Sequence, residues 1–345
     1  MVSGFFFVLS LIASFFFSGK IVPEFHLLEY MKPWDGQSYR ELLSLTFLQE
    51  LGMLKSSFFV WSVFTGAIWF AIIAIVCRFT RVQCLWGVVA IMLGMVSGMM
   101  TLFVVTVQDH HSLVPFDPRD DVVKQLIGLI AGIGLREETI KIVFFLPMLI
   151  VLSRMERPFL RALGFGAMVG LGFAIGENVS YFSDFLLGDV TALITPAARL
   201  CTANPVHFCL TGYLAYAVFR CVKRKGRHWD DMLLDFLIVV IAHAVYDGLL
   251  MMPAVGEYGA LSVIVVALIA YRFFDRVGDV YDNLGSISKI GPLGIYVLGT
   301  CGIIGATFVQ AALFSDWQEA FVIFLSCVAA MFPTAFAFIH RLKDY

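Results

Sequence analysis

The chain has 345 residues, of which 60% are hydrophobic and only 14% charged, and its mean hydropathy is +0.87. This composition leaves too little polar surface to cover a water-soluble globule, and a formal net charge of -2 provides no electrostatic attraction to nucleic acid. Seven cysteines without a CxxC spacing predict neither a disulfide framework nor a thiolate metal site. The sequence therefore predicts an all-α integral membrane protein that lies in the lipid bilayer and does not bind nucleic acid.

Apolar runs of about 17 to 25 residues are long enough to cross the hydrocarbon core as helices. The chain has about ten, near residues 2–18, 57–77, 83–106, 124–153, 160–186, 196–219, 231–252, 258–272, 290–314 and 319–340. The first run lacks a basic segment before it and a clear small-x-small cleavage site after it, so we expect it to be retained as an anchor. We expect a polytopic bundle of about ten transmembrane helices.

Lysine and arginine mark alternate loops, which predicts that these loops are cytoplasmic. The loops concerned carry Arg78 and Arg81, then Arg154, Arg157 and Arg161, then the KRKGR run at 223–227, then Arg272, Arg276 and Lys289, then Arg341 and Lys343. With ten spans, both termini are expected to be cytoplasmic. We divide the chain into N-terminal spans with an extracytoplasmic segment (1–123), a core of four spans (124–252) and a C-terminal extension of three helices (253–345).

Glycine is concentrated in the fifth predicted span, at positions 164, 166, 170, 172 and 176. Two small-xxx-small pairs, 166/170 and 172/176, favour close packing against neighbouring helices. These glycines do not form a dinucleotide-binding loop, because no strand precedes them.

Ionisable residues at bilayer depth are energetically costly, so they are functional candidates by default. The fourth predicted span contains the string REETIK, with Glu137, Glu138 and Lys141. Gly132 and Gly134 precede these charges, so the helix is expected to be tilted or broken there. Glu137 and Lys141 are four residues apart and can neutralise each other, which leaves Glu138 free for chemistry.

The next three spans each contribute further polar side chains, namely Glu177 and Asn178, then Asn204, His207 and Thr211, then His243 and Asp247. A lone buried histidine or asparagine usually just satisfies a neighbouring polar group, but four adjacent spans carry such residues here. In the predicted topology, all of them reach one level in the middle to outer half of the bilayer. We therefore expect one shared site that opens toward the extracytoplasmic side.

These groups suit peptide-bond hydrolysis, which needs an activated water, a stabilised oxyanion and a proton for the leaving amine. In one hypothesis Glu138 is the general base, His207, His243 or Asn178 stabilises the oxyanion, and Asp247 orients His243. In the other, Glu138, His207 and His243 hold a zinc ion and the remaining glutamate is the base. The sequence leaves open whether the cofactor is zinc or none.

Other functions remain as alternatives. The HExxH, GxSG and GxGD motifs of other membrane proteases are absent. A proton- or ion-coupled transporter could use the same glutamates and histidines as a relay. A catalytically silent scaffold would retain its effect after substitution of these residues.

The strings EETIK, GFAIGEN, HFCLT and HAVYD resemble the signature pieces of PrsW-type intramembrane proteases, relatives of the CAAX-processing and bacteriocin-immunity proteases. The resemblance covers roughly residues 130 to 250 and follows the family's order on successive spans. The three spans before this core and the three after it exceed the compact family core.

This resemblance implies that Glu137, Glu138, His207 and His243 are essential, with supporting roles for other polar residues, namely Lys141, Glu177, Asn178 and Asp247. It implies an intramembrane endopeptidase of the cytoplasmic membrane of a prokaryote. The expected substrate is a membrane-anchored protein or peptide, such as an anti-sigma factor cut on its extracytoplasmic side. The family is classed as metallo, whereas the related CAAX proteases resemble metal-free glutamate enzymes, so the resemblance leaves the mechanism open.

Overall fold

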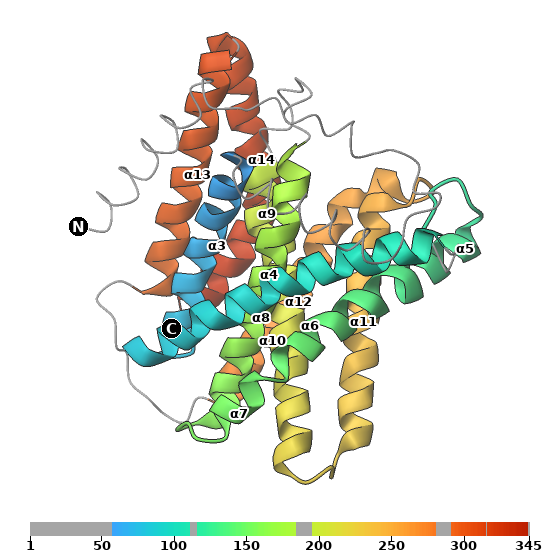
Figure 1. Ribbon diagram of the computed structural model, residues 1–345. Coiled ribbons are helices and arrows are strands. Elements are labelled where there is room, and N and C mark those ends of the chain that lie inside the picture. Colours follow the sequence, from blue (N-terminus) through green and yellow to red (C-terminus); the bar gives the residue numbers. More distant parts are fainter. Residues whose placement is uncertain (1–56, 111–115, 184–194, 281–290, 315, 344–345) are drawn as a thin grey trace.

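The computed structural model describes residues 57–110, 116–183, 195–280, 291–314 and 316–343, and all regular structure in these segments is helical (Figure 1). The longer helices are α3 (Ser57–Val76), α4 (Arg81–His110), α6 (Leu135–Phe145), α8 (Pro158–Ser183), α10 (Ala203–Lys223), α11 (Trp229–Met251), α12 (Ser262–Val280), α13 (Pro292–Phe314) and α14 (Trp317–Leu342). Shorter helices are α5 (Val122–Ile127), η2 (Gly128–Gly134), α7 (Met148–Leu152), α9 (Thr195–Cys201) and η5 (Gly256–Leu261). The predicted all-α class is thus confirmed.

Six of these helices, α3, α4, α8, α11, α13 and α14, are long and apolar enough to cross a membrane. The other predicted spans are shorter or interrupted. The run at 196–219 is divided between α9 and α10, and the run at 258–272 begins in the 3₁₀ helix η5 before α12. The predicted anchor at 2–18 lies outside the described residues.

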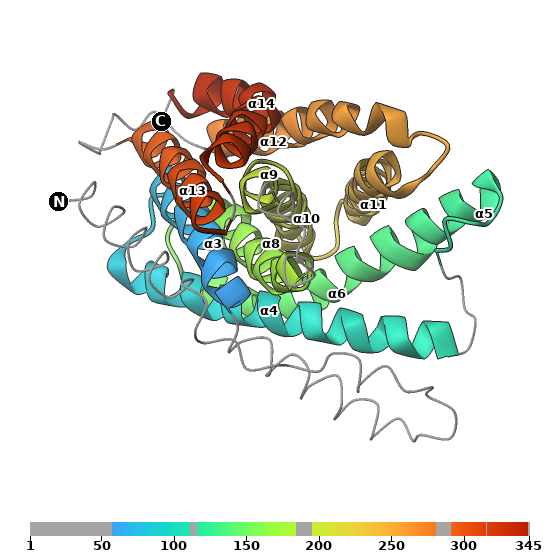
Figure 2. The same cartoon turned by 90° about the horizontal axis from the view of Figure 1, so that it is seen from above.

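Helix α8 lies at the centre of the bundle, next to α10, in both views (Figures 1 and 2). Of its apolar window, 89% is buried inside the protein, compared with 28% for α14. Helices α3, α4 and α10 pack around it. A helix surrounded by protein on several sides can carry polar groups that a lipid-facing helix cannot.

The glycines of α8 permit this crowding. A methyl group on Gly166 would overlap the side chain of Ala215, and one on Gly170 would overlap the carbonyl of His207, both in α10. On another face of α8, a methyl group on Gly172 would overlap the carbonyl of Ile91 in α4. The predicted close packing is therefore confirmed at 166, 170 and 172. It is not found at Gly176, where the nearest atom to an added methyl group is the carbonyl oxygen of Met95 at 3.9 Å.

The fourth predicted span departs from a regular α-helix where glycines precede the charges. Residues 128–134 form a π-helix, η2, between α5 and α6. A methyl group on Gly134 would lie 2.8 Å from the carbonyl oxygen of Val240, so this glycine lets η2 pack closely against α11. The expected irregularity is confirmed, and π-helical turns of this kind often occur at functional sites.

The C-terminal helices pack onto the earlier ones. Helix α12 contacts α10 and α11, α13 contacts α3, and α14 contacts α12 and α9. At their meeting point Trp69 lies among Phe208, Tyr296 and Phe338, with ring centroids 4.8 to 5.5 Å apart, and its indole N–H donates to the carbonyl of Leu200. This aromatic cluster joins the C-terminal helices to the helices that carry the polar residues.

Candidate active site

The π-helix η2 leads directly into α6. This helix presents Glu137 and Glu138, in its first turn, and Lys141, in its second, to the interior. Their side chains are between 0% and 9% exposed. The Lys141 ammonium lies 2.7 Å from Oε1 of Glu138 and 3.6 Å from Oε2 of Glu137. The expected pairing of Lys141 with Glu137 is therefore confirmed, but the expectation that Glu138 stays free is wrong, because Glu138 is the closer partner. The ammonium also lies over the ring of Phe173, with Nζ 4.0 Å from its centroid.

His243 of α11 lies among three carboxylates. Its Nδ1 is 2.7 Å from Oε1 of Glu138, while its Nε2 is 3.2 Å from Asp247 and 3.6 Å from Oε2 of Glu137. A carboxylate can only accept, so Nδ1 donates its hydrogen to Glu138. An unprotonated Nε2 would then direct its lone pair at two carboxylate oxygens. A positive charge at this position, either a proton or a metal cation, removes that repulsion.

His207 of α10 is held from both sides. The Lys141 ammonium is 3.0 Å from Nδ1, and Oε2 of Glu177 is 2.9 Å from Nε2. An ammonium can only donate, so Nδ1 accepts and Nε2–H donates to Glu177. The rings of His207 and His243 are 5.3 Å apart, at 76° to each other. Lys141 thus links the two histidines, directly to one and through Glu138 to the other.

Arg199 of α9 completes this network, and the sequence analysis did not identify it. Its guanidinium donates to Glu177 and to the side-chain oxygen of Asn178 and lies 4.0 Å from the ring centroid of Tyr181. The residue lies near the start of the predicted span at 196–219, a few positions before the polar run of α10. In the predicted topology this is the extracytoplasmic end, where a basic residue is unusual. That departure from the pattern is the signal that could have identified Arg199.

The predicted amide and hydroxyl residues support the helices around the site. Asn178 donates to the side-chain oxygen of Asn204, 2.8 Å away, which joins α8 to the start of α10. Thr211 is buried one turn beyond His207, where its hydroxyl faces Gly170 and has no hydrogen-bond partner among the described residues. Asn178 and Asn204 therefore connect helices, and Thr211 packs against α8.

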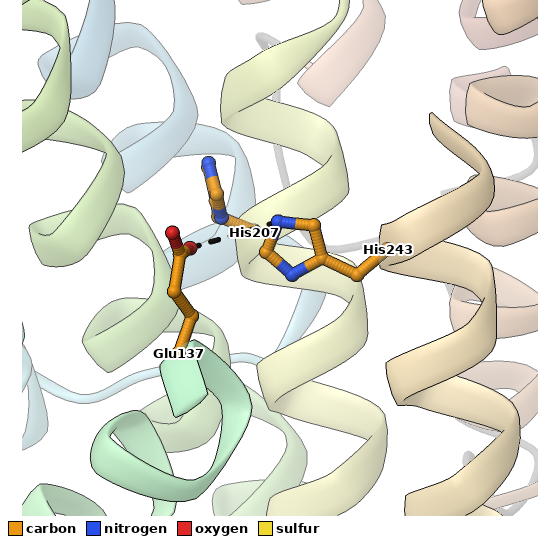
Figure 3. Close-up of side chains that lie close together, drawn as sticks. All are labelled: Glu137, His207 and His243. Atoms are coloured by element: carbon orange, nitrogen blue, oxygen red, sulfur yellow. Dashed lines mark ion pairs between the residues drawn. The ribbon is translucent and has the colours of Figure 1, made fainter. Parts of the chain in front are cut away.

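Three side chains from three helices converge closely enough to bind one metal ion (Figure 3). Glu137, His207 and His243 each offer a ligand atom, and these atoms lie within 4.8 Å of one another. All three residues are buried. This set differs by one residue from the set expected from the sequence, which had Glu138 in place of Glu137.

The donor chemistry of this cluster suits a zinc ion. A carboxylate with two imidazoles is a known ligand set for catalytic zinc, which leaves a fourth position for water. Oε2 of Glu137 is buried and accepts no hydrogen bond from the described residues. The pairing of His243 Nδ1 with Glu138 is the carboxylate–histidine arrangement that orients metal ligands. Both nitrogens of His207 have partners, so ligation by this residue requires one partner to move aside.

A narrow cleft leads to the cluster. It has a volume of about 190 Å³ and is lined by residues of α4, α6 and α8, namely Gly98, Met99, Thr101, Leu102, Val105, Arg136, Glu137, Phe173, Gly176, Glu177 and Tyr181. Two carboxylates, those of Glu137 and Glu177, and one guanidinium, that of Arg136, line it. Glu138 and Lys141 do not, since they lie deeper, with fully buried side chains.

A membrane-embedded helical bundle with buried glutamates and histidines at the end of a cleft defines the class of this protein as a polytopic membrane protein with an intramembrane site. The model of the PrsW family intramembrane metalloproteases matches residues 82–272, more than half of the chain. The chain belongs to this family and is an intramembrane protease. No curated protein and no solved structure matches the chain.

Family membership decides between the alternatives that the sequence left open, because the transporter and the silent scaffold are not proteases. The matched region begins in α4 and ends in α12, so it is wider than the predicted core at 124–252. It includes the α4 side of the cleft. The division of the chain at 123 and 252 stays a prediction.

Proposed function

We propose that the protein is a zinc-dependent intramembrane endopeptidase in which Glu137, His207 and His243 hold the metal. The observation that carries this proposal is the convergence of three buried ligand atoms within 4.8 Å at the inner end of a cleft. When bound there, zinc would polarise the scissile carbonyl and make water a stronger acid. The family's description as metalloproteases also supports a metal.

The predicted base, Glu138, has a different role in this proposal. Its Oε1 accepts from both Lys141 and His243, and its side chain is fully buried. We therefore assign Glu138 to orienting His243, with its charge offset by Lys141.

The carboxylate that activates water is Glu177 in this proposal. Its side chain is 25% exposed, more than that of Glu137 or Asp247, and it lines the cleft. Arg199 and His207 hold this carboxylate in place. A group that takes a proton from water must reach that water, which favours Glu177 over Glu138.

The charge that forms on the substrate carbonyl needs a cation or hydrogen-bond donors nearby. Arg136 lines the cleft, with its guanidinium 3.9 Å from Oε1 of Glu137 and bound to Gln108 of α4. We assign Arg136 to stabilising this oxyanion. The site then contains a base, metal ligands and a cation around the space that a peptide bond would enter.

The substrate in this proposal is a protein anchored in the membrane, such as an anti-sigma factor cut on its extracytoplasmic side. The resemblance of the four polar strings to this protease type supports that class. The predicted topology, with both termini cytoplasmic in a prokaryotic cytoplasmic membrane, places the site at the matching depth.

The proposal is tested with the full chain purified in detergent, a panel of single-span membrane proteins and a measurement of zinc by elemental analysis. We expect one zinc per chain and cleavage of a panel member by the wild type. His207→Ala and His243→Ala should lose both zinc and cleavage. Glu177→Gln should keep zinc and lose cleavage about 100-fold or more.

Cleavage that persists at the wild-type rate after chelation, with zinc absent from the protein, would contradict the metal mechanism and favour glutamate chemistry without metal. Full activity of Glu177→Gln would contradict its role as base and return that role to Glu137 or Glu138. Gln318→Ala, on the exposed first turn of α14, is the matched control and should change neither zinc content nor cleavage.

A further inference from the structure

The short loop between α10 and α11 lies at the far end of α10 from His207 and carries a run of basic residues. Side chains of this run line one open hollow of about 730 Å³, namely those of Lys223, Arg224, Lys225, Arg227 and His228. All five residues are exposed. Among the described residues, no carboxylate lines the hollow, so four positive charges face the same space.

The backbone holds this loop in one compact shape. Gly226 has a φ of 77°, while Lys225 and His228 have φ values of 54° and 72°, in the left-handed region that residues other than glycine rarely adopt. The amide of Gly226 donates to the carbonyl of Cys221, 2.9 Å away, which closes the end of α10. The chain therefore turns from α10 into α11 within residues 224–228, and this tight turn keeps the basic side chains together.

His228 fixes the position of one of these cations. The guanidinium of Arg224 lies 3.1 Å from Nε2 of His228, and Nδ1 of His228 lies 3.1 Å from the carboxylate of Asp231. A guanidinium can only donate and a carboxylate can only accept, so Nε2 accepts from Arg224 while Nδ1–H donates to Asp231. The carboxylate of Asp231 also lies 3.6 Å from the guanidinium of Arg220, so this one negative charge is shared with a cation outside the hollow.

The other three cations of the hollow, those of Lys223, Lys225 and Arg227, form no ion pair with the described residues. Like charges held this close repel each other unless an anion lies between them. A phosphate offers several oxygens that accept from guanidinium and ammonium groups at the same time. The hollow therefore has the charge and the hydrogen-bond donors of a phosphate site.

Apolar residues next to the loop indicate its depth in the membrane. Trp229 begins α11 directly after the basic run and is 62% exposed. One turn further along α11, Leu233 and Leu234 are also exposed, as is Val222 at the end of α10. Tryptophan is enriched at the level of lipid headgroups, and exposed aliphatic side chains beyond it face the acyl chains. The basic hollow therefore lies at headgroup depth.

We propose that this hollow binds the phosphate headgroup of an anionic phospholipid. A free phosphate compound has the same chemistry, but the position at headgroup depth favours a lipid. A volume of about 730 Å³ equals that of about 24 water molecules, so a headgroup with two phosphates can enter. Because the loop joins the helices that carry His207 and His243, the bound lipid would hold these ends of α10 and α11 together. The proposal does not depend on the proposed proteolytic function.

The first test measures lipid binding to the full chain in detergent. Bound phosphatidylglycerol, cardiolipin and, as the neutral probe, phosphatidylcholine are counted by native mass spectrometry. We expect Lys225→Gln/Arg227→Gln to weaken binding of the two anionic lipids about 10- to 30-fold, because each basic residue near an anionic headgroup contributes to affinity. Arg154→Gln/Arg157→Gln is the matched control in another exposed loop. It also removes two charges, one of them at a left-handed residue, and should leave binding unchanged.

The second test changes the shape of the loop without changing its charge. No atom lies within 4 Å of a carbon added to Gly226 or to Gly256, but only Gly226 has a positive φ. A β-branched residue does not adopt this φ without strain, so we expect Gly226→Val to weaken anionic lipid binding about 3-fold or more. Gly256→Val should bind like the wild type. Gly226→Ala should change binding in the same direction, which keeps the test decisive if the valine variant does not fold.

The third test locates the lipid and distinguishes it from a free phosphate. A photoactivatable phosphatidylglycerol should crosslink to residues 222–229 and not to residues 153–157, and unlabelled phosphatidylglycerol should compete, whereas inorganic phosphate at the same concentration should not. Displacement by inorganic phosphate would overturn the lipid as the occupant. Equal loss of binding in the two charge-pair variants would overturn the hollow as the site and leave only general attraction to basic loops. Wild-type binding by Gly226→Val would overturn the dependence on the shape of the loop.

Discussion

The helices around α8 and the pair α13–α14 differ in whether their buried polar side chains are charged. Buried ionisable side chains gather where α6, α8, α10 and α11 meet, namely Glu137, Glu138, Lys141, His207 and His243. In α13 and α14 the buried polar residues are neutral, namely Thr307, Gln310 and Thr334. Helices α8 and α11 are long apolar helices like α13 and α14, so hydropathy does not distinguish these four.

This difference shows where a membrane protein can bury charged side chains. The buried charges of the site have partners of opposite sign within 4 Å, such as Lys141 between two glutamates or Arg199 beside Glu177. Such a set is stable only when complete, because a single remaining charge keeps its full desolvation penalty. The pair α13–α14 relies instead on packing, and its α14 face is mostly uncovered by protein.

Removing the central cation should have the largest effect on folding. Lys141→Met keeps the length of the side chain and its contact with Phe173 but leaves Glu137 and Glu138 without their shared partner. We expect a loss of about 3–5 kcal/mol in the free energy of unfolding, as for other broken buried ion pairs. Unfolding in a mixed-detergent titration measures it.

Lys343→Met, at the exposed end of α14, is the control and should change this value by less than about 0.5 kcal/mol. If Lys141→Met were as stable as Lys343→Met, the charges around α8 would not depend on their pairing, and the contrast between the two regions would disappear.

Loss of the charge that orients His243 should have a smaller effect on stability, because Lys141 keeps Glu137 as a partner, and it should also weaken metal binding. Glu138→Gln keeps a hydrogen-bond acceptor for Nδ1 of His243 but removes its negative charge. We expect zinc affinity to fall about 10- to 100-fold, the usual range for a group that supports a ligand. Competition with a fluorescent chelator measures this. Glu319→Gln on α14 should leave the affinity unchanged, and unchanged affinity in Glu138→Gln would argue that Glu138 has another role.

Close backbone contact around α8 predicts a third difference. Gly170→Ala places a methyl group against the carbonyl of His207, so α8 and α10 must move apart. We expect destabilisation of about 1–3 kcal/mol, typical of an overpacked interior, together with weaker zinc binding because His207 shifts. Gly305→Ala in α13 meets no atom within 4 Å and should be neutral or slightly stabilising. Equal thermal stability of the two variants would contradict the close contact.

Much of this arrangement could be predicted from the sequence, because its causes are local. Apolar runs gave the helices, and the glycines at 166, 170 and 172 gave the packing of α8. The polar strings on successive spans indicated one shared site, and Glu137, His207 and His243 do lie together. Their roles in the reaction stay predictions.

The parts that could not be predicted depend on side-chain rotamers and on how the helices pack. Spacing predicted the pair of Lys141 with Glu137, but Lys141 lies between Glu137 and Glu138 and is closer to Glu138, which depends on side-chain rotamers and not on spacing. Arg199 belongs to α9, outside the four polar strings, and its contact with Glu177 of α8 depends on how α9 packs against α8. The cleft is formed by residues of three helices, α4, α6 and α8, and no local pattern encodes how these pack.

The smallest expected effect lies on the uncovered face of α14. Phe336 is 68% exposed, whereas Phe165 of α8 is fully buried beside Phe79. If lipid covers Phe336, then Phe336→Leu exchanges one apolar contact with lipid for another and should change the free energy of unfolding by less than about 0.5 kcal/mol. Phe165→Leu, which leaves a cavity among packed side chains, should lose about 1–2 kcal/mol.

A loss at Phe336 as large as that at Phe165 would mean that protein and not lipid covers this face. The pair α13–α14 would then be an interior surface like α8, formed by association with another chain, and the contrast in charge would reflect the absence of a site there and not exposure to lipid.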